Sequence, residues 1–254
     1  MERLKRIDKR YGLVGKDISY SFSKNYFGAK FDKLGLDHLE YINYDLTNLN
    51  GFKARIRKEF PVLSGLNVTI PYKEQIIPHL DTLDAEAAEI GAVNTIKFLE
   101  DGSLKGFNTD VYGFKHSLIA MQGDRKKQAL ILGTGGASKA VDFVLKQMNI
   151  RAVFVSRTKN TGQLIYSDLN KEIIESHELI VNCSPLGTFP DVDKCPDIPY
   201  EYLGDRHLLY DLIYNPEKTK FLQLGAQKGA KIQNGLAMLE LQAERSWEIW
   251  NDLV

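Results

Sequence analysis

The stretch ALILGTGGASKA, residues 129–140, decides the fold of the second half of this chain. A run of apolar residues leads directly into Gly133, Gly135 and Gly136. Apolar residues then recur at helical spacing, at Val141, Val144, Leu145 and Met148. A strand, a glycine turn and a helix in this order start a βαβ unit, whose helix N-terminus binds pyrophosphate. The stretch therefore favours a dinucleotide site, although Ser138 breaks the strict GxGxxG spacing and glycine turns also serve purely structural ends.

The next predicted strand, residues 152–155, indicates which dinucleotide is bound. In enzymes that use NAD, an acidic residue about 20 residues beyond the glycine turn binds the ribose hydroxyls. This sequence has no acid there, and the strand ends in Ser156, Arg157 and Thr158 instead. A guanidinium and two hydroxyls suit a 2′-phosphate. The alternative is a solvated arginine at a strand end, but the distance of Arg157 from the glycine turn favours NADP.

Apolar runs and helical periods alternate along the whole chain, which is the pattern of an α/β fold. The second half has further short apolar runs that predict a doubly wound parallel sheet, at residues 179–182, 208–213 and 230–232. The first half has runs that predict strands, at residues 11–14, 39–44, 66–70 and 93–99. The last of these strands continues through Asp101-Gly102 into a hairpin.

Three helices frame these strands. One carries Tyr26, Phe27, Phe31 and Leu34 and ends at Gly35. A second, residues 110–122, leads into the polar stretch 122–128, where the sequence changes character. The last helix bears a broad apolar stripe, made of Leu236, Leu239, Ala243, Trp247 and Trp250. Such a stripe must pack against another part of the protein.

The segment GLNVTIPYK, residues 65–73, is the first candidate substrate site. Strand alternation places Leu66, Val68 and Ile70 on one face and Asn67 and Thr69 on the other, where they suit two oxygens of one polyhydroxylated ligand. Because proline suits a first helical position, Pro71 predicts a helix whose opening turn holds Lys73. The helix dipole then lowers the pKa of the lysine and makes it a usable proton carrier. The alternative is an ordinary surface lysine.

Two further polar clusters are also candidate substrate sites. AVNT, residues 92–95, and GFNTD, residues 106–110, bring Asn94 and the carboxylate of Asp110 to the mouth of a helix. In the loop of residues 15–23, Ser21 and Ser23 lie two apart before a helix, a reasonable cradle for a small carboxylate. The structural alternative is that Asp110 and Ser23 are only helix caps.

Composition narrows the possible functions. Hydrophobic residues make up 43% of the 254 residues and charged residues 26%, which indicates a folded globular chain. Lys plus Arg equals Asp plus Glu at 33 each, so no net basic field is available for nucleic acid or an anionic membrane. No apolar run approaches a membrane span, and the start MERLKRIDKR is unlike a secretory signal. We therefore expect a cytoplasmic protein with a small-molecule substrate and no bound metal.

The order of motifs along the chain resembles the shikimate dehydrogenase family. The resemblance covers nearly the whole chain and rests on Ser21 and Ser23 followed by GLNVTIPYK, AVNT, NTD, GTGGAS, SRT, YDLIYNP and NGLAMLELQA. It implies an N-terminal α/β substrate domain over residues 1–110, joined by the C-terminal helix 236–254. It also implies a C-terminal Rossmann-like, doubly wound NADP-binding domain over residues 111–235, with a cleft between the two domains. The oligomeric state is left open between monomer and homodimer.

The resemblance also implies an activity and assigns roles to residues. The activity is the reversible, NADPH-dependent reduction of 3-dehydroshikimate to shikimate, in the biosynthesis of aromatic amino acids. Lys73 and Asp110 form the catalytic pair, with Lys73 as proton donor and acceptor. The substrate carboxylate is held by Ser21 and Ser23, and its ring hydroxyls by Asn67, Thr69, Asn94, Asp110, Tyr214 and Gln242. The cofactor is held by Gly133, Thr134, Gly135, Gly136, Ala137, Ser156, Arg157, Thr158, Leu212 and Gly235.

The sequence departs from the family pattern at several positions. The family's serine loop reads GxPxxHSxSPxxH, and the two prolines and two histidines are replaced here by Asp17, Tyr20, Lys24 and Phe27. The altered loop leaves open a quinate/shikimate dehydrogenase that uses NAD or both cofactors, although Arg157 argues against NAD. A noncatalytic nucleotide-sensing module is a further alternative, against which Lys73 and Asp110 argue.

Overall fold

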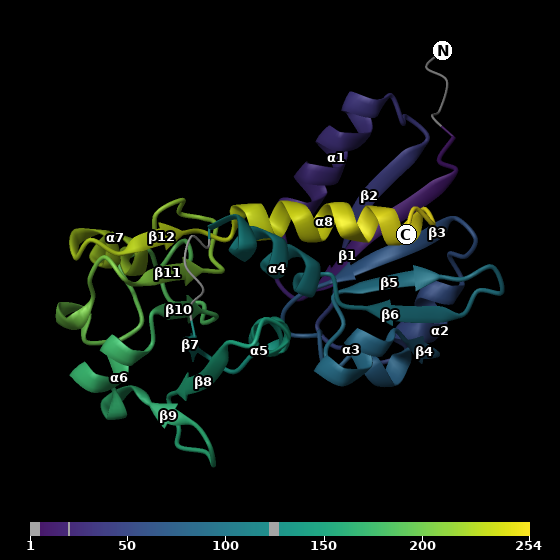
Figure 1. Ribbon diagram of the computed structural model, residues 1–254. Helices are drawn as coiled ribbons and strands as arrows, with labels where there is room; N and C mark the ends of the chain where they lie inside the picture. Colours follow the sequence, from purple (N-terminus) through teal and green to yellow (C-terminus); the bar gives the residue numbers. More distant parts are fainter. Residues whose placement is uncertain (1–5, 20, 122–126) are drawn as a thin grey trace. The chain divides into compact units, whose positions relative to one another are not determined.

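The computed structural model describes residues 6–19, 21–121 and 127–254. The chain divides into two compact units, of which the first comprises Met1–Thr109 and Ala243–Val254 and the second Asp110–Gln242. Helix α8 (Leu236–Trp250) contributes to both units, because the division falls between Gln242 and Ala243. Each unit is built on a sheet of its own (Figure 1).

The first unit contains a mixed sheet with the strand order β2-β1-β3-β5-β6-β4. Strand β1 pairs in parallel with β2 and β3, whereas β5 pairs antiparallel with β3 and β6. The strands are β1 (Lys9–Gly15), β2 (Leu39–Asp45), β3 (Leu63–Val68), β4 (Thr82–Leu83), β5 (Thr95–Phe98) and β6 (Leu104–Phe107). The β5–β6 pair confirms the predicted hairpin.

Helix α1 (Phe22–Leu34) and the second half of α8 cover one face of this sheet. Their buried side chains form an aromatic layer with Tyr11 of β1 and Tyr41 of β2. Trp250 stacks on Tyr11 with ring centroids 4.8 Å apart, and its indole Nε1 donates to the carbonyl oxygen of Ile96 at 3.0 Å. The apolar stripe of the last helix therefore packs on the first sheet.

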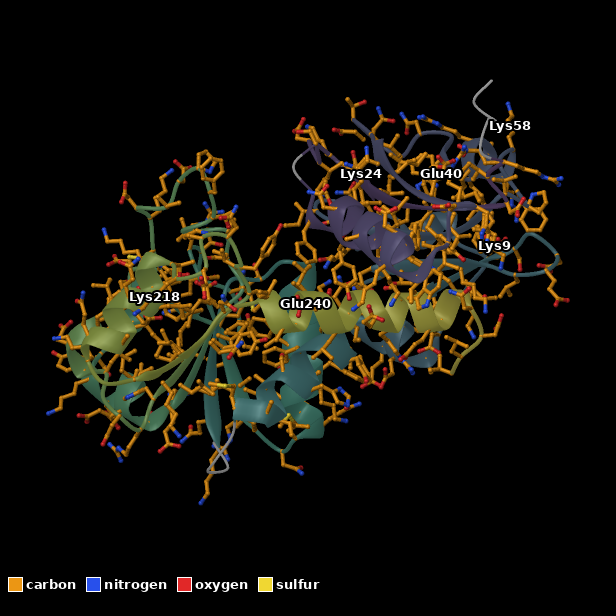
Figure 2. The ribbon with its side chains drawn as sticks, turned by 90° about the horizontal axis from the view of Figure 1, so that it is seen from above. Lys9, Lys24, Glu40, Lys58, Lys218 and Glu240 are labelled. Atoms are coloured by element: carbon orange, nitrogen blue, oxygen red, sulfur yellow. The ribbon has the colours of Figure 1, made fainter. Side chains whose placement is uncertain are left out.

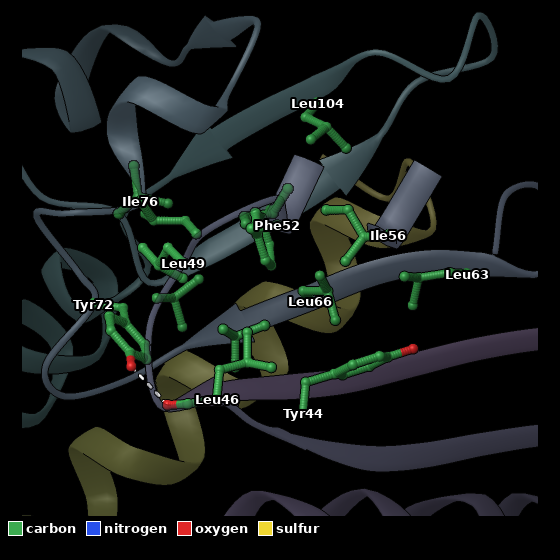
Figure 3. Packing of buried hydrophobic residues seen from close by; sticks show 14 of the residues in the cluster. Tyr44, Leu46, Leu49, Phe52, Ile56, Leu63, Leu66, Tyr72, Ile76 and Leu104 are labelled. Carbon is green, nitrogen blue, oxygen red and sulfur yellow. Dashed lines mark hydrogen bonds between the residues drawn. The ribbon is translucent and has the colours of Figure 1, made fainter. Parts of the chain in front are cut away.

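The opposite face of the first sheet carries a second apolar cluster. It is covered by α2 (Phe52–Arg57), α3 (Ala85–Ile90) and the short 3₁₀ helix η1 (Ile77–His79). Figure 3 shows Phe52 and Ile56 packed over Leu63 and Leu66. The same view shows the Tyr72 hydroxyl donating to the backbone oxygen of Leu46, at 2.6 Å.

The second unit contains a sheet whose strands are all parallel, in the order β12-β11-β10-β7-β8-β9. The strand order reverses between β7 and β10, which confirms the predicted doubly wound α/β fold. The strands are β7 (Gln128–Leu132), β8 (Arg151–Ser156), β9 (Leu164–Ile165), β10 (Leu179–Asn182), β11 (Leu208–Asp211) and β12 (Lys231–Gln233).

Helices cover both faces of the second sheet. On one face α4 (Asp110–Met121) packs against α5 (Gly136–Gln147), and Phe114 of α4 meets Tyr210 of β11 edge-on at 5.1 Å. The other face is covered by α6 (Lys171–Ser176), α7 (Lys220–Gln227) and the short turns η2 (Tyr166–Asp168) and η3 (Tyr200–Tyr202). Both layers bury the apolar strands, as parallel sheets require.

Charged side chains lie on the outside of each unit. Lys24 and Lys58 of the first unit and Lys218 and Glu240 of the second are exposed, and Figure 2 shows their side chains at the outer surface. Within the described residues, no helix combines the length and apolar character needed to cross a bilayer.

Two strand predictions run two residues past the carboxyl end of the observed strand. Residues 66–70 were expected to form one strand, but β3 ends at Val68, and Ile70 is 72% exposed instead of facing the core. The reason is a turn in which the Tyr72 amide donates to the Thr69 oxygen at 2.9 Å. The sequence also predicts one strand over residues 208–213, but β11 ends at Asp211. The Asp211 carboxylate accepts the Ile213 amide there, and this hydrogen bond turns the chain.

Gly65 of β3 gives a test of the packing between α8 and the first sheet. A Cβ atom at this position would lie 2.6 Å from Trp250 Cε2, and the indole cannot move without losing its bond to Ile96. We expect Gly65→Ala to lower the free energy of unfolding by about 1–3 kcal/mol, measured by urea denaturation. Gly28→Ala in α1 is the control, because nothing lies within 4 Å of that Cβ; equal stability of Gly65→Ala and the control would contradict the packing.

Candidate functional site

The glycine turn lies where the strand order of the second sheet reverses. Gly133 follows β7 with φ of 108°, a left-handed conformation that favours glycine, and its amide donates to the Val155 oxygen at 2.9 Å. A Cβ atom at Gly133 would lie 3.2 Å from the Ser184 amide nitrogen, so the turn packs against the end of β10. Ligands of doubly wound sheets bind at this position, outside the carboxyl ends of the strands.

The residues around this turn fit a dinucleotide. Gly135 is the N-cap of α5 and provides no capping side chain, and the first turn of α5 contains no acidic residue. Nothing lies within 4 Å of a Cβ atom at Gly135, so a phosphate can approach the helix terminus closely. Thr134 is exposed, and Gly136 and Ala137 are half-buried. Ser138, which breaks the glycine pattern, is buried, and its hydroxyl donates to the Gly135 oxygen at 2.6 Å.

The end of β8 presents the predicted 2′-phosphate groups. Arg157 and Thr158 are exposed. Ser156 is buried, and its hydroxyl donates to the Thr158 carbonyl oxygen. The hydroxyl proton of Ser156 therefore shapes the turn, which leaves the Arg157 guanidinium and the Thr158 hydroxyl as the accessible donors.

The structure brings together Leu212 and Gly235, which are far apart in sequence. A Cβ atom at Gly235 would lie 2.5 Å from the Leu212 carbonyl carbon, and the Gly235 amide donates to the Ile213 oxygen at 3.0 Å. Only glycine permits this approach. The start of α8 is therefore fixed against the chain that leaves β11, as expected if both residues line one end of the cofactor site.

Asp211 is a buried carboxylate that the sequence reasoning missed. It accepts hydrogen bonds from Thr219 Oγ1 at 2.6 Å, from Asn182 Nδ2 at 3.0 Å and from the Ile213 amide at 3.1 Å. Asn182 in turn accepts from the amide and hydroxyl of Ser184. The network fixes the ends of β10 and β11 beside the glycine turn. A charged residue at the end of the apolar strand LLYD was the signal for it.

In the first unit, Asn67 is the centre of a buried hydrogen-bond network. Its Oδ1 accepts from the Tyr41 hydroxyl at 2.8 Å, and its Nδ2 donates to Ser246 Oγ at 2.9 Å and to Thr95 Oγ1 at 3.2 Å. Burial raises the pKa of the Tyr41 hydroxyl above its ordinary value. Side chains from β2, β5 and α8 thus hold the Asn67 amide in one orientation.

Asn94 continues this network toward α4. Its Oδ1 accepts from the Thr109 amide at 2.7 Å and from the Thr109 hydroxyl at 3.2 Å. Thr109 directly precedes Asp110, the buried first residue of α4. The network therefore connects two predicted substrate residues, Asn67 and Asn94, and reaches the residue next to the predicted catalytic carboxylate.

The expected helix at Lys73 is absent. Residues 71–76 form successive turns that end in η1. The Lys73 carbonyl oxygen accepts from the Val93 amide at 2.7 Å, and Ile77 donates to Glu74, so the i to i−4 pattern cannot propagate from Lys73. The helix-dipole argument for this lysine is therefore wrong. Lys73 is half-buried, and the buried ring of the neighbouring Tyr72 holds its turn in place.

The serine loop lies next to Thr69. A Cβ atom at Gly15 would be 2.5 Å from Ile18 Cγ2 and 2.6 Å from Thr69 Cγ2, so this glycine lets the loop and the strand end meet. Ser21 is the N-cap of α1, accepting the Ser23 amide at 3.2 Å, so the structural alternative in which Ser23 is the cap does not hold. Of the altered positions, Asp17 and Lys24 are exposed, Phe27 is buried in the core, and Tyr20 lies outside the described residues.

The predicted site residues are divided between the two units. Lys73 and the residues of the serine loop and β3 belong to the first unit, whereas Asp110, Tyr214, Gln242 and the cofactor residues belong to the second. Tyr214 is half-buried after β11. Gln242 is buried on α8, where Nε2 donates to the Leu239 oxygen at 2.9 Å.

Comparison with known proteins identifies the family. The family model for the shikimate dehydrogenase substrate binding domain matches residues 13–96. A shikimate dehydrogenase (NADP(+)) from Desulforamulus reducens is 35% identical, over 94% of this chain and 88% of its own length. The chain belongs to the shikimate dehydrogenase family.

Solved structures of related proteins share the fold. Shikimate 5-dehydrogenase from Thermus thermophilus, in complex with NADP(H) and shikimate, is 32% identical with a TM-score of 0.85, over 97% of this chain and 94% of that chain. The ligand-free 5-ketofructose reductase of a Gluconobacter species is 27% identical with a TM-score of 0.82, over 98% and 94%. The fold alone therefore does not determine the substrate, which the site residues must decide.

Asp211 gives a pH-dependent test of the second unit. Burial raises the pKa of Asp211 from 3.8 to about 6, against the opposite effect of its hydrogen-bond donors. At a pH between 3.8 and about 6, the Asp211 side chain keeps its proton in the folded state and has lost it in the unfolded state. This group therefore makes the free energy of unfolding fall as the pH rises through this range, by at most about 3 kcal/mol. We expect Asp211→Asn to remove this fall, measured by urea denaturation of both proteins across this range. Parallel pH profiles for the two proteins would contradict it.

Proposed function

We propose that this chain catalyses the reversible, NADPH-dependent reduction of 3-dehydroshikimate to shikimate, in the shikimate pathway of aromatic amino-acid biosynthesis. The observation that carries the proposal is the match over 97% of the chain to a solved structure in complex with NADP(H) and shikimate. Cytoplasmic location is part of the same proposal. The first unit is the substrate domain, supported by the family model over residues 13–96, and the second is the NADP domain, supported by its glycine turn.

The substrate residues act by fixing a small polyhydroxylated acid. The hydroxyls of Ser21 and Ser23 donate hydrogen bonds to its carboxylate at the start of α1, where the helix terminus favours negative charge. Asn67, Thr69, Asn94, Asp110, Tyr214 and Gln242 are assigned to the ring hydroxyls. Because the buried network holds the Asn67 and Asn94 amides, they do not have to reorient when substrate binds.

The catalytic step divides proton and hydride between protein and cofactor. When bound, NADPH supplies the hydride for the ring carbonyl carbon. Lys73 Nζ gives a proton to the carbonyl oxygen, and in the oxidation of shikimate it takes that proton back. Asp110 binds the neighbouring hydroxyl and provides the negative charge that balances the lysine. Arg157 and Thr158 bind the 2′-phosphate, and the amides of Gly135 and Gly136 bind the pyrophosphate.

The direct test measures reduced nicotinamide by absorbance, with shikimate and quinate each offered with NADP and NAD. The proposal expects shikimate with NADP to be turned over fastest. Fastest turnover of quinate, or of shikimate with NAD, would favour the quinate/shikimate dehydrogenase that the altered serine loop leaves open. No turnover of any pair would favour a nucleotide-sensing module.

Arg157 tests the cofactor preference. Loss of a charge-assisted bond to the 2′-phosphate predicts that Arg157→Ala weakens NADPH binding roughly 10- to 150-fold and leaves NADH binding nearly unchanged. Dissociation constants from nicotinamide fluorescence measure both. Arg151→Ala, at the opposite end of β8, is the control that should alter neither. Equal losses for NADPH and NADH would remove the basis for a 2′-phosphate site at Arg157.

Lys73 tests the proton transfer. Lys73→Ala is expected to fold and bind NADPH but to lose about 10²- to 10⁴-fold in turnover, because positioned proton transfer typically contributes that much. Steady-state kcat for shikimate oxidation measures the loss. Lys58→Ala, an exposed lysine of the same unit, is the control. Unchanged kcat in Lys73→Ala would contradict the assigned role.

A further inference from the structure

The loop between β1 and α1 is held by the last residue of β2. Asp45 accepts the backbone amide of Asp17 on Oδ1, at 2.9 Å, and the backbone amide of Ile18 on Oδ2, at 3.2 Å. Both carboxylate oxygens of Asp45 are therefore engaged by consecutive amides of the loop. The register of the sheet makes this possible, because Asp45 pairs with Gly15, the last residue of β1.

A second side chain of β2 holds the same loop residue. Asn43, two residues before Asp45 and thus on the same side of the strand, donates from Nδ2 to the Ile18 carbonyl oxygen at 3.0 Å. Ile18 is fixed at its amide by Asp45, at its carbonyl by Asn43 and at its side chain by burial in the aromatic layer, where it is 5% exposed. We call Asn43 and Asp45 the β2 clamp.

The β2 clamp acts on the serine pair through one hydrogen bond. The Ser21 amide donates to the Ile18 oxygen at 3.1 Å, and the Ser21 side chain caps α1 by accepting the Ser23 amide. The position of Ile18 therefore sets where Ser21 stands, and the capped helix sets where Ser23 stands.

The backbone of Asp17 explains how the Asp45 carboxylate can hold this loop. Its φ is 55°, a left-handed conformation that Asp tolerates better than most residues and that proline cannot adopt. Proline at this position, as in the family's usual loop, would also lack the amide hydrogen that Asp45 accepts. The change from proline to Asp17 and the contact with Asp45 thus belong to one arrangement of the loop.

We propose that Asp45, assisted by Asn43, is a positioning residue for the binding of the substrate carboxylate by Ser21 and Ser23. The inference rests on the proposed function, because that function supplies the carboxylate. Asp45 does not touch the substrate in this scheme. Its two carboxylate oxygens accept backbone amides and hold the loop in the conformation that binds the substrate carboxylate.

The experiment compares Asp45→Ala and Asp45→Asn with the wild-type enzyme in shikimate oxidation. For an exposed carboxylate that holds two amides, the expected rise in KM for shikimate is about 5- to 30-fold in Asp45→Ala, and smaller in Asp45→Asn, which retains one oxygen acceptor. The KM for NADP should stay within about 2-fold, since the loop belongs to the first unit. Asp101→Ala is the matched control, because Asp101 also accepts a loop amide, that of Ser103 at 2.9 Å. It should leave both constants unchanged.

A double-mutant cycle separates positioning from general destabilisation. In a Ser21→Ala background, Asp45→Ala should cost at most about 2-fold more in KM, because the serine through which it acts is already absent. Full additivity of the two substitutions would overturn the proposal, as would a shikimate KM within about 2-fold of wild type in both Asp45 variants.

Hydrogen exchange at the amides of Asp17, Ile18 and Ser21 tests the β2 clamp without any ligand. Exchange at these amides should be faster in Asp45→Ala than in Asp101→Ala, and equal rates would overturn the β2 clamp. This measurement distinguishes the two proposals. A wild-type enzyme that does not oxidise shikimate refutes the proposed function, whereas unchanged exchange refutes the β2 clamp.

Discussion

The first unit depends on one buried amide, the side chain of Asn67. A polar group in an apolar interior is stable only if its donors and acceptors find partners. Asn67 finds them on three other elements: Tyr41 on β2, Thr95 on β5 and Ser246 on α8. A buried amide without hydrogen-bond partners costs free energy. These three hydrogen bonds therefore fix both the strand register and the position of α8.

In the second unit, a buried carboxylate has the same role as the Asn67 amide has in the first. Asp211 joins the ends of β10 and β11 through Asn182 and holds Thr219 at the start of α7. Both buried polar groups lie beside residues assigned to ligand binding, Asn94 in one unit and Leu212 in the other. Rigidity at these points reduces the entropy lost when a ligand binds.

Much of the fold could be predicted from the sequence because it is encoded locally. The glycine turn after residues 129–132 and the apolar strands of the second half carry their patterns within a few residues. The two-residue strands β4 and β9 carry too little pattern to be recognised. The helix at Lys73 was predicted from Pro71, but a distant amide, that of Val93, takes the carbonyl that a helix would have used. A tertiary contact decided against a local preference.

The candidate site was predictable only where a residue type indicates its own chemistry. Arg157, Lys73 and the serine pair could be selected in this way. Asp45, Tyr41 and Ser246 could not, because each acts through a partner far away in sequence. These residues matter because of the sheet register and the position of α8, and no short sequence motif encodes either of them.

The placement of Trp250 against Tyr11 has a consequence for how the protein forms in the cell. All six strands of the first sheet are translated before the second unit begins, yet the face that α1 covers in part is completed only when the final helix leaves the ribosome. The nascent first unit must therefore expose aromatic surface while more than a hundred residues are still being added. Domains usually fold in the order in which they are made. Here the packing around the earliest strands is the last to be completed, because it needs side chains of the final helix.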